Sequence, residues 1–167
     1  MEWHSKGNVI LVGSEDTTCW MFNADSGKCL QVFGGHGASV TVGKFNSSGN
    51  KIITGSEDES IKIFDPKTGE CLFTFGSDSL SESAIHSIAA KPDDPIIFLA
   101  GTATGEAFMT SIKQKKVLAK LEAHEDSIES VTFCDGLPIF ATASMDSTIC
   151  LWDDSNLKLR HKLENQV

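Results

Sequence analysis

The stretch GSEDTTCWMFNADSGKC at residues 13–29 returns 42 residues later as GSEDESIKIFDPKTGEC at residues 55–71, and this repetition decides the fold. A third copy, ASMDSTICLWDDSNLKL, begins at Ala143, which lies 88 residues after Gly55. Halfway between them, GTATGEAFMTSIKQKK from Gly101 keeps the same apolar rhythm with weaker identity. Self-similarity at a fixed period of roughly 40 residues indicates a chain built from repeated structural units. Four such units are present.

Each unit has the pattern of a small antiparallel sheet. In the second unit, four short runs rich in β-branched or aromatic residues are separated by Gly, Asn, Asp and Pro, which predicts strands at residues 40–45, 51–55, 60–64 and 71–75. Alternation in the third run places Ile61 and Ile63 on one face and Phe64 on the other. Because both faces are apolar, each sheet must pack between neighbouring sheets, as the blades of a β-propeller do. The sequence therefore predicts an all-β propeller of four-stranded blades.

Two histidines and one dipeptide give the repeats a family resemblance. His36 and His124 each lie 19 residues before the start of a turn, at Gly55 and Ala143, and Trp152 is followed by Asp153. With these features the chain resembles the WD-repeat family over essentially all of its 167 residues. The dipeptide is degenerate in the other units, at residues 22–23, 64–65 and 110–111. We expect repeats at about 1–36, 37–78, 79–124 and 125–163.

The number of repeats and the third repeat depart from the family's pattern. The resemblance implies a ring of seven or eight blades, and four blades leave two sheet faces bare. With a first strand expected at residues 1–4, we interpret residues 1–167 as a partial propeller, a piece of a longer protein. The third unit carries four extra residues near 79–82, with Asp78 in the place of the histidine and Thr104 in that of the turn aspartate. We expect it to be the loosest blade.

A narrower resemblance rests on less generic stretches. These are EWHSKGNVILVG at residues 2–13 and SIESVTFCDGLPIFATASMDSTICLWDDSNLKLRHKL at residues 127–163. They are similar to the family of the angio-associated migratory cell protein and its fungal relatives, which act as dedicated chaperones of a large-subunit ribosomal protein. This resemblance implies a role in ribosome assembly.

Composition and motifs exclude several classes of function. The net charge of −9 argues against direct nucleic-acid binding, because phosphate contacts need Lys and Arg. The five cysteines form no CxxC pair, so neither a disulfide framework nor a metal site is expected. The chain has no apolar run of membrane-spanning length, no signal-peptide pattern, and no Walker, GxGxxG or HExxH motif. We therefore expect a cytoplasmic protein, present also in the nucleus, with no cofactor, small-molecule substrate or membrane contact.

The repeated polar residues have two interpretations. His124, Ser144 and Asp146 supply the residue types of a hydrolase triad, but the same types recur at His36, Ser56 and Asp58. A catalytic site is not normally duplicated in every blade, whereas a structural device is. The family resemblance implies a structural network of a His, a strand Ser or Thr, a turn Asp and the Trp indole. In the fourth unit this network would join His124, Thr142 or Ser144, Asp146 and Trp152.

The tryptophans and the second unit allow related predictions. Phe64 takes the place of Trp152 in the second unit and cannot donate a hydrogen bond, so that unit keeps a partial network of His36 and Asp58. Trp3, Trp20 and Trp152 occur at unequal repeat positions, which favours core packing over an aromatic cage for a methylated lysine. We expect no enzyme activity, and a hydrolase built on His124 and Ser144 remains the rival hypothesis.

Acidic residues gather in one set of loops. The loops between blades and the turns between second and third strands project from the same rim, and these segments hold twelve acidic residues and no Lys or Arg. Turn preference explains Asp but not Glu. The acids least needed for turns are Glu15, Glu57, Glu82, Glu125 and Asp126, hereafter the acidic rim. We expect the rim to bind a basic protein segment in a non-enzymatic scaffold. The alternative is a general adaptor in signalling, cell migration or ubiquitin-ligase assembly.

Overall fold

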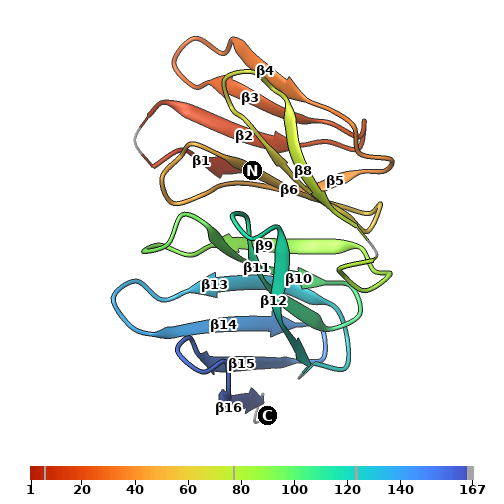
Figure 1. Ribbon diagram of the computed structural model, residues 1–167, viewed down its shortest axis with the longest axis vertical. Coiled ribbons are helices and arrows are strands. Elements are labelled where there is room, and N and C mark those ends of the chain that lie inside the picture. The colour runs from red at the N-terminus through yellow and green to blue at the C-terminus, as the bar shows by residue number, and fades with distance from the viewer. Residues whose placement is uncertain (6, 77, 123, 165–167) are drawn as a thin grey trace.

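The computed structural model describes residues 1–5, 7–76, 78–122 and 124–164, which form sixteen strands in four antiparallel sheets. In Figure 1 the four sheets follow one another along the long axis, from the N-terminal sheet to the C-terminal sheet. The described residues contain no helix, and thus none that could cross a membrane. The prediction of an all-β chain of WD-type, four-stranded blades is confirmed.

Each blade uses four consecutive strands, paired in chain order. Blade 1 contains β1 (Glu2–Trp3), β2 (Val9–Gly13), β3 (Cys19–Asn23) and β4 (Cys29–Phe33). Blade 2 contains β5 (Val40–Phe45), β6 (Ile52–Ser56), β7 (Ile61–Phe64) and β8 (Cys71–Phe75). Blade 3 contains β9 (Ile85–Ala90), β10 (Ile97–Thr102), β11 (Glu106–Ser111) and β12 (Lys116–Glu122). Blade 4 contains β13 (Ile128–Phe133), β14 (Ile139–Ser144), β15 (Thr148–Asp153) and β16 (Leu159–Glu164).

The expected strands of blade 2 agree with the observed ones to within one residue at each end. The first strand of blade 1 is shorter than expected. It ends at Trp3, because the backbone N–H of His4 bonds to the carbonyl of Val9 and starts the turn into β2.

Apolar side chains fill the spaces between blades. Blades 1 and 2 bury Leu11, Phe33, Ile52 and Phe64 between them, and two further clusters lie between blades 2 and 3 and between blades 3 and 4. The blades approach closely at glycines of the second strands. A β-carbon on Gly55 would lie 2.5 Å from Ile85 Cγ2 of the next blade, and one on Gly101 would lie 2.6 Å from Ile128 Cγ2. Glycine is therefore required for this packing.

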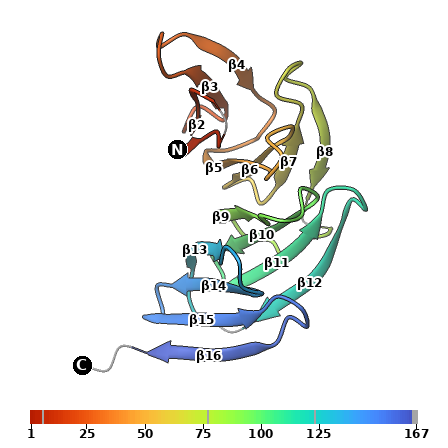
Figure 2. The same cartoon turned by 90° about the vertical axis from the view of Figure 1, so that its left-hand side faces the viewer.

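The outermost strand of every blade contains a bulge at the same place. Register shifts in the pairing of β4, β8, β12 and β16 leave one extra residue in each strand, and the four extra residues are Leu30, Leu72, Leu118 and Arg160. All four side chains are exposed. In Figure 2 these strands lie at the outer side of the stack, and β1, β5, β9 and β13 lie at the inner side. A bulge twists an edge strand and interrupts its pairing groups.

The three tryptophans occupy different surroundings. Trp152 is buried and stacks on Phe140, while half-buried Trp20 stacks on Phe22. The prediction of core packing is wrong for Trp3, whose side chain is 59% exposed. Trp3 pairs with Ile10 on the face of blade 1 that no described blade covers. None of these ring contacts joins two tryptophans.

Candidate functional site

A hydrogen-bonded network links the loop before β13 to the body of blade 4. His124 Nε2 lies 2.7 Å from Thr142 Oγ1, and Trp152 Nε1 donates to the same hydroxyl at 3.0 Å. His124 Nδ1 lies 3.0 Å from Asp146 Oδ2. Because an ionised carboxylate only accepts hydrogen bonds, Nδ1 carries the ring proton. Thr142 then accepts a hydrogen bond from the indole and donates one to Nε2. Each of these side-chain groups therefore has a hydrogen-bond partner within the network.

Asp146 is the anchor of this network. Its Oδ1 accepts from the backbone N–H of Thr148 at 2.9 Å and from the Thr148 hydroxyl at 2.6 Å, and its Oδ2 accepts from the N–H of Glu125 at 3.1 Å. Burial alone would raise the pKa of Asp146. The hydrogen bonds from Thr148, Glu125 and His124 outweigh burial and hold this pKa well below its usual value. The carboxylate is thus ionised, and both of its oxygens accept hydrogen bonds within the network.

Ser144 does not contact the imidazole. Its hydroxyl donates to the carbonyl of Asp126 at 2.9 Å and accepts from the N–H of Asp146 at 3.1 Å, which braces the turn. The structure therefore places Thr142, and not Ser144, between His124 and Trp152. The hydroxyl beside the histidine belongs to Thr142 and is fully buried. Thr148 completes the network and was missed from the sequence, although a hydroxyl two residues after the turn Asp recurs in three units.

Blade 2 contains the same network without the indole. His36 Nδ1 lies 2.9 Å from Asp58 Oδ2, and His36 Nε2 lies 2.7 Å from Thr54 Oγ1. Ser60 takes the part of Thr148, with its hydroxyl 2.6 Å from Asp58 Oδ1. Burial lowers the pKa of His36. Burial alone would raise the pKa of Asp58, but hydrogen bonds from Ser60, Gly37 and His36 lower it to about 2.

Blade 3 lacks both the network histidine and the turn aspartate. Counted from the first strand, Ser81 lies four residues before Ile85, as His36 lies before Val40 and His124 before Ile128. Counted from the preceding outer strand, Asp78 lies three residues after Phe75, as His36 lies after Phe33 and His124 after Leu121. The inserted residues separate these two positions, so the placing of Asp78 stays a prediction.

Ser83 Oγ is buried with no hydrogen-bond partner among the described residues. Burial alone would raise the pKa of Glu106, but hydrogen bonds from Lys120 and Ser81 lower it, so the Ser81 hydroxyl lies against this carboxylate. Leu80, from the same loop, is buried in the core between blades 2 and 3.

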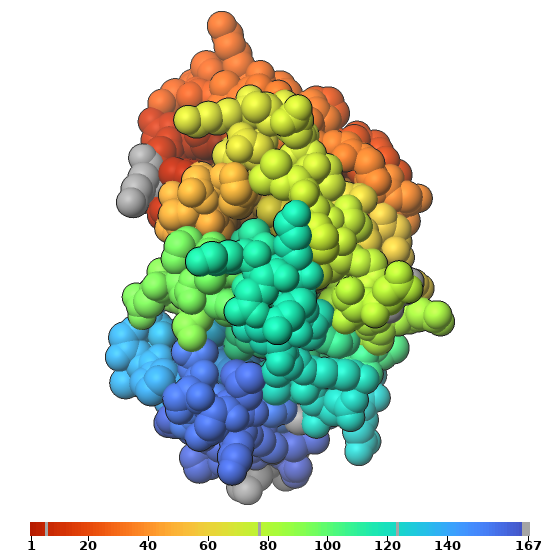
Figure 3. All heavy atoms as spheres, viewed as in Figure 1, coloured from red at the N-terminus to blue at the C-terminus, as the bar shows by residue number. Residues whose placement is uncertain are grey.

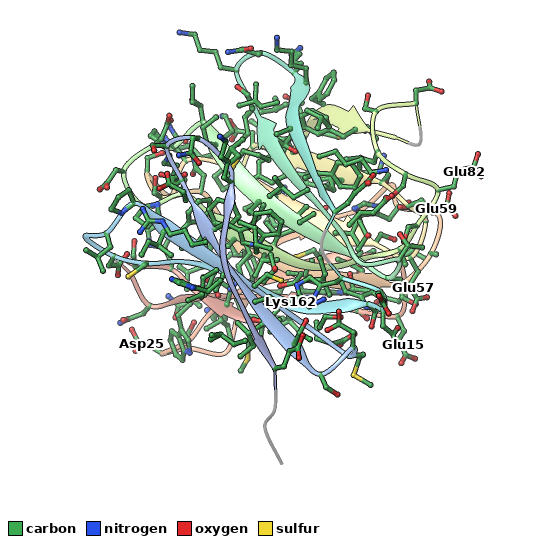
Figure 4. The ribbon with its side chains drawn as sticks, turned by 90° about the horizontal axis from the view of Figure 1, so that it is seen from below. Glu15, Asp25, Glu57, Glu59, Glu82 and Lys162 are labelled. Carbon is green, nitrogen blue, oxygen red and sulfur yellow. The ribbon has the colours of Figure 1, made fainter. Side chains whose placement is uncertain are left out.

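Three residues of the acidic rim lie on one side of the molecule. In Figure 4, Glu15, Glu57 and Glu82 lie along the same side together with Glu59, and Asp25 lies on the opposite side. All five residues of the rim are exposed. Glu57 accepts from the Ser39 hydroxyl at 2.8 Å, and Asp126 accepts from the N–H of Ser127 at 2.7 Å. None of the five forms an ion pair with a described residue.

Lysines from the outer strands neutralise other acids near this side. Lys120 Nζ lies 2.5 Å from Glu106 Oε1 and 2.7 Å from Glu122 Oε1, and Lys162 Nζ lies 3.9 Å from Asp146 Oδ2. The rim segments contain no base in sequence, but the strands bring two lysines beside them. A hollow of about 310 Å³ opens beside Lys162, lined also by Glu125, Asp146 and Glu164.

Among the residues that the structure places, no group of three or more His, Cys, Asp or Glu side chains could hold a metal ion. A second hollow of about 510 Å³ lies where the inner strands end, between Trp3, Lys44, Pro92 and Phe133.

Comparison with protein families identifies two repeats directly. The family model described as "WD domain, G-beta repeat" matches residues 27–65 and 115–153. Each match runs from the outer strand of one blade through the first three strands of the next. These two segments contain both histidine networks.

Curated relatives match over different lengths. The human angio-associated migratory cell protein is 28% identical over 181 residues, which cover 99% of this chain and 41% of the relative. An uncharacterized WD repeat-containing protein of Schizosaccharomyces pombe is 38% identical over 71 residues, covering 42% of this chain and 18% of the relative. Human DDB1- and CUL4-associated factor 10 is 33% identical over 73 residues, covering 44% and 13%. The chain thus spans about two fifths or less of the length of these relatives.

Proposed function

Because this chain contains WD repeats, we propose that it is a non-enzymatic scaffold. In this proposal its acidic rim captures a basic segment of another protein. WD-repeat proteins are protein-interaction scaffolds, which supports the general part of this proposal. The observation that carries the specific part is a set of five exposed carboxylates without ion pairs among the described residues, three of which, Glu15, Glu57 and Glu82, lie on one side of the blades (Figure 4).

Unpaired rim charges suit capture better than folding. An exposed carboxylate contributes little to stability, but several on one side sum to a negative potential that attracts and orients a cationic segment. The hollow beside Glu125 and Glu164 offers room for a long basic side chain to approach Asp146, where Lys162 now lies.

The partner that we propose is a large-subunit ribosomal protein. The chain is similar over nearly its whole length to the angio-associated migratory cell protein, and the chaperone role comes from the resemblance of residues 2–13 and 127–163 to that family. The mechanism is charge shielding, because a free basic tail would otherwise bind nucleic acid indiscriminately. In this proposal the protein acts in the cytoplasm and also in the nucleus.

A charge-matched pair of variants tests the rim. Glu15→Lys, Glu57→Lys and Glu82→Lys together should weaken binding of a fluorescein-labelled peptide of twelve Lys and Arg residues by about tenfold or more, measured by anisotropy. The control reverses Glu70, Asp93 and Asp135, which are exposed and lie in loops away from the rim. Raising salt from 50 to 150 mM should weaken wild-type binding, since screening lengths shorten to roughly 8 Å. Equal losses in both variants would show a net-charge effect and reject the rim.

A second candidate is a ubiquitin-ligase adaptor, favoured by the similarity to DDB1- and CUL4-associated factor 10. This candidate predicts a complex with DDB1 in gel filtration that persists when the rim is reversed. If no complex with DDB1 forms while peptide capture is intact, the adaptor candidate is rejected and the chaperone proposal stands.

A further inference from the structure

The turn between β11 and β12 is a basic knob on an acidic protein. Residues 112–116 read IKQKK, so three lysines, Lys113, Lys115 and Lys116, fall within four residues with no acid among them. All three are exposed. None of them pairs with a carboxylate of the described residues, although the chain carries a net charge of −9. The acidic-rim proposal makes no use of this turn.

The backbone of the knob is unusual at Lys115. Its φ is +54°, whereas the equivalent positions in blades 1 and 2 are glycines, Gly27 at +66° and Gly69 at +76°. In blade 4 the equivalent residue is Leu157 at +59°. A lysine in this left-handed region costs conformational energy that glycine avoids. Its side chain crosses to blade 2, where Nζ lies 5.1 Å from the centre of the Phe73 ring. This cation–π contact braces the knob against β8 and fixes its orientation.

Apolar side chains border the knob. Phe73, Ile112 and Val117 pack against the core between blades 2 and 3. Beyond them, the bulge residues Leu72 and Leu118 are 43% and 41% exposed. In the space-filling view the atoms of β8 and of the β11–β12 hairpin adjoin on the outer side of the stack (Figure 3). Lys113 and Lys116 therefore stand beside exposed apolar surface on a braced turn.

We infer that this knob is a second docking surface, which binds an acidic, leucine-containing segment of a partner protein. Charge complementarity favours an acidic partner. The exposed leucines offer apolar surface that leucines of the partner could bury. The same features disfavour nucleic acid. Nucleic acid has no apolar side chains to cover the exposed Leu72 and Leu118, and the knob has no arginine to bind phosphate groups in a bidentate way.

The test uses a labelled twelve-residue peptide of eight glutamates and four leucines, with fluorescence anisotropy in 50 mM salt. Lys113→Glu with Lys116→Glu should weaken binding about tenfold or more. The matched control, Lys28→Glu with Lys158→Glu, reverses two lysines in the equivalent turns of blades 1 and 4 and should change binding by less than about twofold. Lys115 is left unchanged because it braces the turn. A peptide with Gln for Glu should bind at least about tenfold more weakly than the acidic one.

Several results would overturn the inference. These are no binding of the acidic peptide by wild type, equal losses in both double variants, or tighter binding of single-stranded nucleic acid or anionic vesicles than of the peptide. If the Glu variant loses its cooperative thermal transition, Lys113→Gln with Lys116→Gln replaces it, with a loss of about threefold or more expected. Reversal of the acidic rim should leave this binding in place, so failure of one proposal is distinguishable from failure of the other.

Discussion

Blades 3 and 4 share one strand order and one outer-strand bulge, but they secure the loop that enters them by different means. In blade 4, His124, Thr142, Asp146 and Trp152 form a closed hydrogen-bonded network. In blade 3, buried Leu80 inserts into the core, and the Ser83 hydroxyl nearby is left without a partner among the described residues. The first means depends on complete polar satisfaction and the second on apolar burial.

The comparison shows that the four-stranded frame does not require the network. Apolar clusters on both sides hold blade 3 in place, since Phe98 and Ala100 pack toward blade 2 while Leu99 and Met109 pack toward blade 4. The network therefore fixes one entry loop. Breaking it should destabilise the blade that contains it, and strongly only where the polar groups are buried.

The largest effect is expected from His124→Ala. Removing the imidazole leaves buried Thr142 and the Asp146 carboxylate each without one hydrogen-bond partner. This loss should lower the free energy of unfolding by about 2–3 kcal/mol. Urea denaturation measures the change, and hydrogen exchange should show it concentrated in blade 4. A loss below about 0.5 kcal/mol would mean that both blades rest on apolar packing alone.

Trp152→Phe gives blade 4 the side chain that blade 2 has at Phe64. The loss of one indole donor should cost about 1–2 kcal/mol. Because Thr142 is bonded to both His124 and Trp152, combination with His124→Ala should be less than additive by about 1 kcal/mol in a double-mutant cycle. Strict additivity in urea denaturation would contradict a shared network.

A pH effect of middle size should follow from Asp58 in blade 2. Its folded pKa of about 2 is below the unfolded value, so its stabilisation is full above about pH 5 and is lost as the pH falls toward 2. After allowance for solvent screening, this loss is on the order of 1 kcal/mol. Asp58→Asn should flatten the acid limb of the stability curve, whereas Thr104→Ala at the equivalent place in blade 3 should leave its shape unchanged.

The smallest effect is expected from Ser83→Ala in blade 3. The hydroxyl is buried without a partner among the described residues, so its removal should change stability by no more than about 0.5 kcal/mol, in the stabilising direction if at all. Thermal unfolding measures the change, and Thr142→Ala of blade 4, which breaks two hydrogen bonds, serves as the comparison. A loss above about 1 kcal/mol for Ser83→Ala would reveal a polar network in blade 3 as well.

Repetition made the fold predictable, because equivalent strands could be compared unit by unit. The choice between Thr142 and Ser144 was not predictable, since both side chains point to the same face of β14 and only the distance from Trp152 separates them. The histidine's place in blade 3 could not be fixed to one residue, because the inserted residues lie between β8 and β9. Lys120 and Lys162 were missed as neighbours of the acids because outer strands, and not turns, carry them.

The bulges in β4, β8, β12 and β16 determine how an extended peptide could associate with the perimeter. A strand can be added to a sheet only where an edge presents an uninterrupted ladder of N–H and C=O groups. Each outer edge here is broken at the same point by Leu30, Leu72, Leu118 or Arg160. Backbone pairing along the perimeter is thereby discouraged, so a captured segment would be recognised through its side chains. The charge pattern and spacing of the partner's side chains would then matter more to affinity than its propensity to form β-structure.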